Sequence, residues 1–141
     1  MTEEESNNVA LLEKGYAFWN QSKADCEGVS CWMALLSDDV QWRSLAAGAA
    51  GMEFTRACRS KDEVQSYFQE LGKDWELLSY NADEFIAQGD RVVMLGSCAW
   101  KHRGTGKTVK SPKADVIRMR DGKIVDFMEF YDTAAAIAGA T

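Results

Sequence analysis

Two carboxylates near the C-terminus, Asp115 and Glu129, are the residues of this chain best suited to do chemistry. If residues 124–132 form a strand, its side chains alternate between two faces. Glu129 then shares its face with three apolar or aromatic residues: Val125, Phe127 and Tyr131. In the same way, Asp115 shares a face with Ile117 and Met119. A carboxyl group among apolar side chains loses hydration, which raises its pKa and suits it to acid–base catalysis near pH 7.

The two acids are predicted to meet across a hairpin. Asp121-Gly122 is typical of a tight turn, and it would pair the strand that carries Asp115 with the strand that carries Glu129. Both acids would then point to one apolar surface. The alternative is that both lie at the rim of the sheet, or form cross-strand ion pairs that contribute little. Three basic residues could supply such pairs: Lys113, Lys123 and Arg118.

The other two acids of this stretch have simpler interpretations. Alternation places Asp126 on the opposite face of the strand, where solvent or a dimer contact would suit it. Asp132 precedes Thr133 at the start of an alanine-rich tail, and its side chain is predicted to cap a short C-terminal helix.

The elements that must position these acids fall into two groups along the chain. Apolar residues at three- and four-residue spacing predict helices near residues 9–19, 26–37 and 60–71, the last ended by Gly72. A first strand is predicted at 39–44, and four more follow at 75–87, 91–102, 108–119 and 123–131. Residues 1–8 are expected to be flexible and 9–141 to form a single domain. This order predicts an α+β fold, with helices on one face of a curved antiparallel sheet.

Composition excludes several classes of partner. The net charge is −6 and basic residues are not clustered, so no nucleic-acid partner is expected. No apolar run approaches the roughly 20 residues that a membrane span needs, so no membrane partner is expected. The N-terminal MTEEESNN is acidic and polar, unlike a secretory signal, which predicts a cytoplasmic protein.

The loop sequence GTGKT, residues 104–108, lacks the spacing of a phosphate-binding loop and is predicted to be a hairpin turn.

The four cysteines lack the paired spacing of a zinc site, and His102 is the only histidine. Neither a metal nor another cofactor is therefore expected. Buried, reduced thiols are the favoured interpretation of all four: Cys26, Cys31, Cys58 and Cys98. A cysteine nucleophile with His102 as its base is the alternative.

The chain resembles a known family. The segment TGKTVKSPKADVIRMRDGKIVDFMEFYDT, together with YAFWNQ and ALLSDDVQW, is similar to SnoaL-like, ketosteroid-isomerase-related proteins of the NTF2-like superfamily. The resemblance covers about residues 9–138. It implies a cone, in which three N-terminal helices and a short C-terminal helix pack on a strongly curved antiparallel sheet around an apolar pocket. It also implies a homodimer formed through the outer face of the sheet.

The resemblance also implies roles for individual residues. Tyr16 and Asp115 fall where ketosteroid isomerases place the two hydrogen-bond donors to the substrate oxyanion. The proton-shuttling aspartate of those enzymes falls at Ser44, whose hydroxyl is too weak a base, so steroid isomerisation itself is not predicted. Glu129 falls where relatives of the epoxide-hydrolase and cyclase type place an acid. For Tyr16, a core position with its hydroxyl at solvent is the alternative.

The expected function is that of a cofactor-independent acid–base enzyme of the isomerase, cyclase, hydrolase or lyase type, acting on a small apolar molecule. Glu129, Asp115 and Tyr16 are the predicted catalytic residues. Predicted substrate-binding residues are Trp42, Phe68, Trp100, His102, Phe127 and Tyr131, although the aromatic ones would also suit an ordinary core and His102 an exposed rim. A non-catalytic binding module and a dimeric interaction domain are the alternatives.

Overall fold

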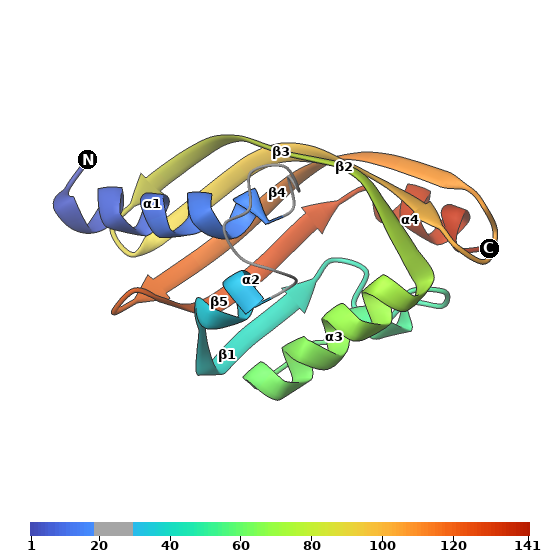
Figure 1. Cartoon of the computed structure of the whole chain (residues 1–141), viewed down its shortest axis with the longest axis horizontal. Helices are drawn as coiled ribbons and strands as arrows, with labels where there is room; N and C mark the ends of the chain where they lie inside the picture. The colour runs from blue at the N-terminus through green and yellow to red at the C-terminus, as the bar shows by residue number, and fades with distance from the viewer. Residues whose placement is uncertain (19–29) are drawn as a thin grey trace.

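The computed structural model of the protein describes residues 1–18 and 30–141 (Figure 1). Helices lead and a long antiparallel meander follows, as the sequence predicts. The elements are α1 (Glu3–Ala17), α2 (Ser30–Ala34), β1 (Leu36–Ser44), the 3-10 helix η2 (Glu53–Thr55), α3 (Lys61–Asp74), β2 (Trp75–Gln88), β3 (Arg91–His102), β4 (Thr108–Arg120), β5 (Lys123–Tyr131) and α4 (Thr133–Gly139).

The five strands form one curved sheet in the order β1-β5-β4-β3-β2, with antiparallel pairing from β5 to β2. The exception to the predicted antiparallel sheet is β1, which pairs with β5 in parallel. Asp115 and Glu129 are direct partners in the register of β4 and β5, which confirms that the two acids face each other across the hairpin. The sheet curves around an interior that α1 and α3 cover (Figure 1).

The helix boundaries differ from the predicted ones for local reasons. Helix α1 begins at Glu3 instead of near Val9, because Thr2 and Glu5 form a reciprocal capping box. Helix α2 ends at Ala34, where β1 soon begins; the predicted residues 26–29 of this helix lie outside the described part of the chain. Helix α3 continues through Gly72, the predicted stop, to Asp74.

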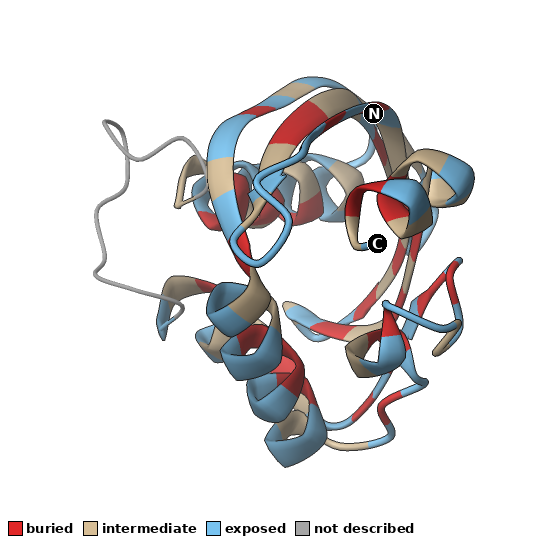
Figure 2. Cartoon of the chain, turned by 90° about the vertical axis from the view of Figure 1, so that its right-hand side faces the viewer, coloured by how far each residue is buried: buried red, intermediate tan, exposed pale blue. Residues whose placement is uncertain are grey.

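The interior is divided into two apolar clusters. The larger one lies between the sheet and helices α1, α2 and α3 and contains fully buried residues such as Leu12, Trp32 and Ile117. The smaller one lies beneath α4 and contains Ala46, Met52, Trp75, Val109 and Ala136. Figure 2 shows the buried positions of the helices and strands turned toward this interior and the exposed ones turned outward. The predicted cap of α4 is confirmed, because Asp132 Oδ1 accepts the N–H of Ala135 at 2.9 Å.

The cysteines only partly follow the prediction of reduced thiols. Cys58 and Cys98 are free and buried, as predicted. Cys31 is disulfide-bonded, so the prediction is wrong for this residue. Cys26 lies outside the described residues. Within residues 1–18 and 30–141, no helix is long and apolar enough to cross a membrane.

Candidate functional site

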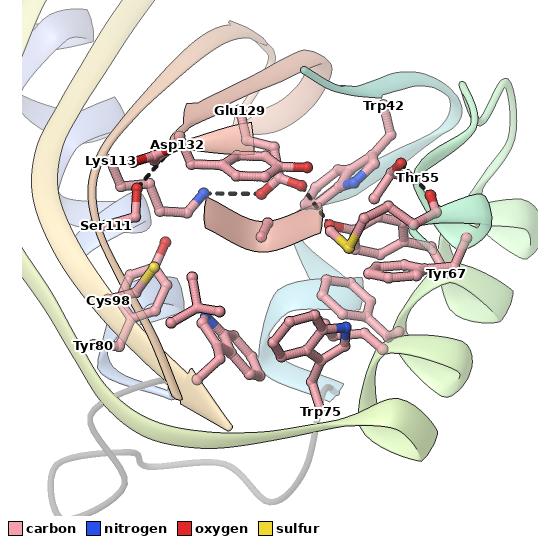
Figure 3. A pocket seen from close by; sticks show the side chains of 18 of the residues that line it. Trp42, Thr55, Tyr67, Trp75, Tyr80, Cys98, Ser111, Lys113, Glu129 and Asp132 are labelled. Carbon is pink, nitrogen blue, oxygen red and sulfur yellow. Dashed lines mark hydrogen bonds and ion pairs between the residues drawn. The ribbon is translucent and has the colours of Figure 1, made fainter. Parts of the chain in front are cut away.

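A cavity of about 90 Å³ lies between the inner face of the sheet, α3 and α4 (Figure 3). Its wall is largely apolar and aromatic. Six of the residues predicted from sequence line it: Trp42, Phe68, Trp100, Phe127, Glu129 and Tyr131. Other lining residues were not predicted, and the polar ones among them are Thr55, Tyr67, Tyr80, Cys98, Ser111, Lys113 and Asp132. The cavity therefore combines aromatic walls with a few convergent polar groups, as ligand sites usually do.

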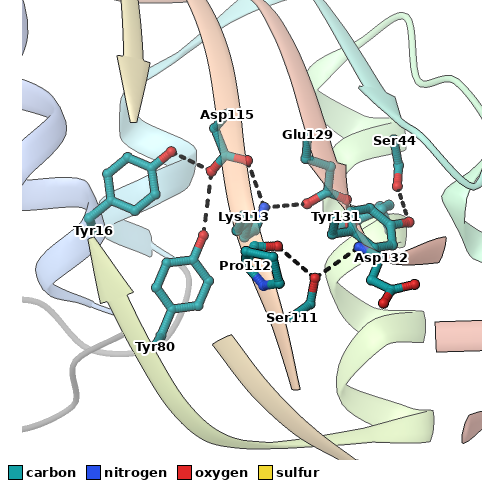
Figure 4. A network of polar contacts seen from close by, with 11 residues as sticks. Tyr16, Ser44, Tyr80, Ser111, Pro112, Lys113, Asp115, Glu129, Tyr131 and Asp132 are labelled. Carbon is teal, nitrogen blue, oxygen red and sulfur yellow. Dashed lines mark hydrogen bonds and ion pairs between the residues drawn. The ribbon is translucent and has the colours of Figure 1, made fainter. Parts of the chain in front are cut away.

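The polar centre of the site is Lys113, which lies between the two acids (Figure 4). Its Nζ is 2.6 Å from Asp115 Oδ1 and 2.9 Å from Glu129 Oε2. The side chain of Lys113 is 7% exposed, that of Asp115 0% and that of Glu129 11%. The shared apolar face and the ion pair with Lys113, which sequence reasoning treated as alternatives, are thus both present. Lys123 and Arg118 contact other groups, the carbonyl of Ala34 and the carboxylate of Asp90.

Three tyrosine hydroxyls complete the shell of hydrogen bonds around the acids. Tyr16 donates to Asp115 Oδ2 at 2.5 Å, and Tyr80 donates to the same oxygen at 3.4 Å. Tyr67, on α3, donates to Glu129 Oε1. Each carboxylate therefore receives hydrogen bonds on both of its oxygens, one of them from Lys113. Such charge-assisted bonds hold the side chains in a fixed arrangement.

Burial and charge act in opposite directions on the groups of this network. Burial raises the pKa of Asp115, although the Lys113 ammonium and the hydrogen bond from Tyr16 oppose the rise. Burial by itself would lower the pKa of Lys113, but the carboxylates of Asp115 and Glu129 outweigh it and hold this pKa well above its ordinary value. Lys113 is therefore a permanent ammonium at neutral pH. Burial and the nearby Glu129 charge raise the pKa of Tyr131 to about 12.

The hydrogen-bond donors implied by the family resemblance are turned away from the cavity. Neither Tyr16 nor Asp115 is among the residues that line it, and Asp115 is 0% exposed. The Tyr16 hydroxyl is already used on Asp115, and Lys113 stands between Asp115 and Glu129. Tyr16 therefore orients Asp115, and Asp115 in turn accepts a hydrogen bond from Lys113 on the side away from the cavity. In this arrangement Tyr16 and Asp115 do not form an oxyanion hole.

Two other polar residues considered from the sequence, Ser44 and His102, also form their contacts away from the predicted roles. Ser44 is buried, and its hydroxyl lies 2.5 Å from that of Tyr131. His102 does not line the cavity, contrary to the prediction. Its Nδ1 accepts the N–H groups of Gly104 and Thr105, at 3.2 and 3.1 Å, so the ring is held in the hairpin turn. His102 therefore stabilises the turn after β3.

Lys113 lines the cavity, and sequence reasoning did not name it as a candidate site residue. Strand alternation could have placed Lys113 at the site, because residues 113 and 115 of the same strand share a face. Lysine is almost never fully buried unless it is paired, so the apolar pattern gave no reason to place it inside. Within residues 1–18 and 30–141, no group of three or more His, Cys, Asp or Glu side chains could hold a metal ion.

Comparison with solved structures confirms the fold. An NTF2-like protein of Burkholderia thailandensis is 26% identical, with a TM-score of 0.79 over 95% of this chain and 97% of the other. A putative SnoaL-like polyketide cyclase from a Jannaschia species is 14% identical, with a TM-score of 0.77 over 99% and 95%. TerC, co-crystallised with polyporic acid, is 23% identical, with a TM-score of 0.77 over 95% and 98%.

The comparison with curated proteins found no match. The family model of the SnoaL-like domain, however, matches residues 13–127, which include the end of α1, Lys113 and most of the sheet. The curved sheet, the aromatic cavity and this match agree with one another. The protein is a member of the SnoaL-like domain family within the NTF2-like fold.

Proposed function

We propose that the protein is a cofactor-independent acid–base enzyme that acts on a small, mostly apolar molecule carrying a carbonyl group. Glu129 would transfer the proton and Lys113 would stabilise the oxyanion that develops on the carbonyl. The observation that carries this proposal is the buried pair of Lys113 and Glu129, 2.9 Å apart, in the wall of an otherwise largely apolar cavity.

Lys113 is suited to stabilising negative charge. An ammonium has three N–H donors, of which Asp115 and Glu129 take two, so one remains for an oxygen of the ligand. A fixed positive charge in a site that excludes water stabilises an enolate far better than the same charge in solution. Because the pKa of Lys113 is raised well above its ordinary value, the residue is not a nucleophilic amine, and Schiff-base chemistry is disfavoured.

Glu129 is suited to receiving a proton next to that charge. Tyr67 and Lys113 each donate to one of its oxygens, which orients the carboxylate. Each oxygen has a second lone pair that can accept a proton. When a proton leaves the carbon beside a carbonyl group, it would pass to Glu129, and the electron pair would move to the carbonyl oxygen near Lys113. Return of the proton to another carbon would complete an isomerisation. In a ring closure, the enolate carbon would instead bond to a second carbonyl carbon of the same ligand, and the proton on Glu129 would pass to the oxygen of that carbonyl.

The relatives give independent support for a small-molecule site. One is described as a putative SnoaL-like polyketide cyclase, and TerC was co-crystallised with polyporic acid. Both descriptions fit a cavity that binds an organic ligand within this fold.

Exchange of carbon-bound hydrogen for deuterium tests the proposed step without knowledge of the substrate. Cyclic aryl ketones would be incubated with the protein in D2O, and loss of the signal of the hydrogens beside the carbonyl would be followed by proton NMR. The wild type should exceed the buffer rate, and Glu129→Gln should lower the catalysed rate by about 100-fold or more. Glu76→Gln, an exposed glutamate on β2, is the matched control. Undiminished exchange in folded Glu129→Gln would refute the assignment.

A non-catalytic binding module is the second candidate, and the environment of Ser44 favours it. The position that carries the base in ketosteroid isomerases has no carboxylate here, and its hydroxyl is hydrogen-bonded to Tyr131. In a binding module, ketone probes would bind the wild type and Glu129→Gln about equally, and neither protein would accelerate exchange.

A further inference from the structure

A second hollow lies on the outer face of the sheet, opposite the face that lines the cavity. Its volume is about 80 Å³, and it spans β3, β4, β5 and β1, which are neighbours in the sheet (Figure 1). Its floor contains Val116 and Met128, which are direct register partners on β4 and β5. The charged residues that line it are Arg43, Arg91, Arg118 and Asp126.

The arginines give this hollow a local excess of positive charge, although the whole chain carries a net charge of −6. Three guanidinium groups line it, and Asp126 is the one acid among the lining residues. Arg91 and Arg118 are direct register partners on β3 and β4. Like charges directly opposite each other on neighbouring strands are destabilising. An anion bound between the two arginines would offset this repulsion.

The ion pairs of these arginines use only part of their hydrogen-bonding capacity. Arg43 Nη2 is 2.9 Å from Asp126 Oδ1. Arg118 Nε is 3.7 Å from Asp90 Oδ2, which is too long for a hydrogen bond. Within residues 1–18 and 30–141, Arg91 forms no ion pair. Because a guanidinium group has five N–H donors, Arg91 and Arg118 keep donors for an oxyanion.

The shape and the floor of the hollow favour a carboxylate over other anions. A planar carboxylate matches the fork of a guanidinium group and accepts two parallel hydrogen bonds from it. A short hydrocarbon chain on that carboxylate would cover the half-buried side chains of Val116 and Met128 and bury apolar surface. Phosphate would lose hydration against this floor and place more negative charge beside Asp126. A volume of about 80 Å³ equals that of about three water molecules in the liquid, which suits a small ligand.

We propose that this outer hollow is a binding site for a small monocarboxylate with a short apolar chain. Arg91 and Arg118 bind the carboxylate, Arg43 neutralises Asp126, and the chain of the ligand lies on the apolar floor. The site is on the other face of the sheet from Lys113 and Glu129. It therefore goes beyond the proposed function and does not depend on it.

Titration with butyrate, followed by NMR, tests the site. Backbone ¹⁵N–¹H spectra of the labelled protein would be recorded with increasing sodium butyrate, at an ionic strength kept constant with sodium chloride. The shifts should saturate in the millimolar range. Formate, which lacks the chain, should bind at least about fourfold more weakly, the contribution of one buried methylene group. Butyramide, which has a similar shape and no charge, should not bind.

Four variants locate the binding at the arginines. Arg91→Gln and Arg118→Gln should each weaken butyrate binding by about tenfold or more, because each removes charge-assisted hydrogen bonds. Arg59→Gln, which removes an exposed arginine outside the hollow, is the matched control and should leave the affinity unchanged. Asp126→Asn should tighten binding about two- to fivefold, because it removes a negative charge and releases Arg43. The spectrum of each variant also verifies that it is folded.

Leu95→Lys separates this site from a contact between two copies of the chain. Leu95 lies on the same outer face and does not line the hollow, so this variant should bind butyrate at least as tightly as the wild type. Loss of binding in folded Leu95→Lys would overturn a site formed by one chain. Equal affinity of the wild type, Arg91→Gln and Arg118→Gln, or shifts that never saturate, would overturn the site itself. Equal binding of formate and butyrate, or tighter binding of phosphate, would overturn the ligand class.

Discussion

Replacing Lys113 with methionine should cost the protein a large part of its stability at neutral pH. The ammonium lies 2.6 and 2.9 Å from carboxylates whose side chains are 0% and 11% exposed, so its removal leaves two buried acids without a counter-charge. Breaking a buried ion pair in this way costs about 3–5 kcal/mol. For a chain of this size, that corresponds to a melting temperature lower by about 10–20 °C.

The stability lost in Lys113→Met should depend on pH, and the pKa values of the two buried acids should set the direction of this dependence. Burial already raises the pKa of Asp115, and without Lys113 it should rise further. An acid whose folded-state pKa exceeds its unfolded value binds its proton more tightly in the folded protein, so stability falls as pH rises through that window. Lys113→Met should therefore regain stability as pH is lowered from 8 toward 5. In the wild type, the raised pKa of Lys113 keeps its contribution present until strongly alkaline pH.

Urea and thermal unfolding followed by circular dichroism between pH 5 and 8 would measure both effects. The matched control is Lys110→Met, which removes an exposed lysine from the same strand and should change the free energy of unfolding by no more than about 0.5 kcal/mol. A Lys113→Met variant as stable as Lys110→Met would contradict a stabilising role of the buried ion pairs. A stability deficit that stays constant between pH 5 and 8 would contradict the raised pKa of the buried acids.

Substitutions at three further positions test other contacts in the structure. Tyr67→Phe removes the hydrogen bond to Glu129 and should cost about 1.5–3 kcal/mol in urea unfolding, with slower deuterium exchange; unchanged exchange would contradict an orienting role. Leu95→Lys places a charge on the outer sheet face, where Leu95 and Phe130 are 37% and 39% exposed, and should dissociate the expected homodimer in light scattering; a monomeric wild type would contradict the dimer. Asp132→Ala should cost about 1 kcal/mol by removing the cap of α4, and Asp132→Asn should restore most of it.

Strand alternation was sufficient to predict the central pairing of the site. Asp115 and Glu129 lie on inward-facing positions of a regular hairpin, so their faces and register follow from the turn and the period of two. The same rule places Asp126 outside, where it pairs with Arg43 at 2.9 Å. This part of the site depends only on residues close together in the sequence.

The tyrosine partners of these acids could not be predicted from strand alternation, because they come from distant parts of the chain. Tyr16 is 99 residues from Asp115, and Tyr67 is 62 residues from Glu129. The contact of each hydroxyl depends on how its helix packs on the sheet. Lys113 is close in sequence, but a lysine is stable inside only when two acids converge on it, and that convergence is a property of the whole fold.

Lys113 gives the proposed site a chemistry different from that of a ketosteroid isomerase. Where a ketosteroid isomerase would direct a tyrosine and an acid at the ligand, Tyr16 and Asp115 here hold the ammonium from behind, and Lys113 and Glu129 face the cavity. In the proposed reaction, the donor to the ligand is therefore a full positive charge instead of a neutral acid. Such a donor stabilises an anion more strongly, and the carboxylate beside it can take the proton that creates the anion. The proposed site therefore acts through the ion pair of Lys113 and Glu129 and not through two neutral hydrogen-bond donors.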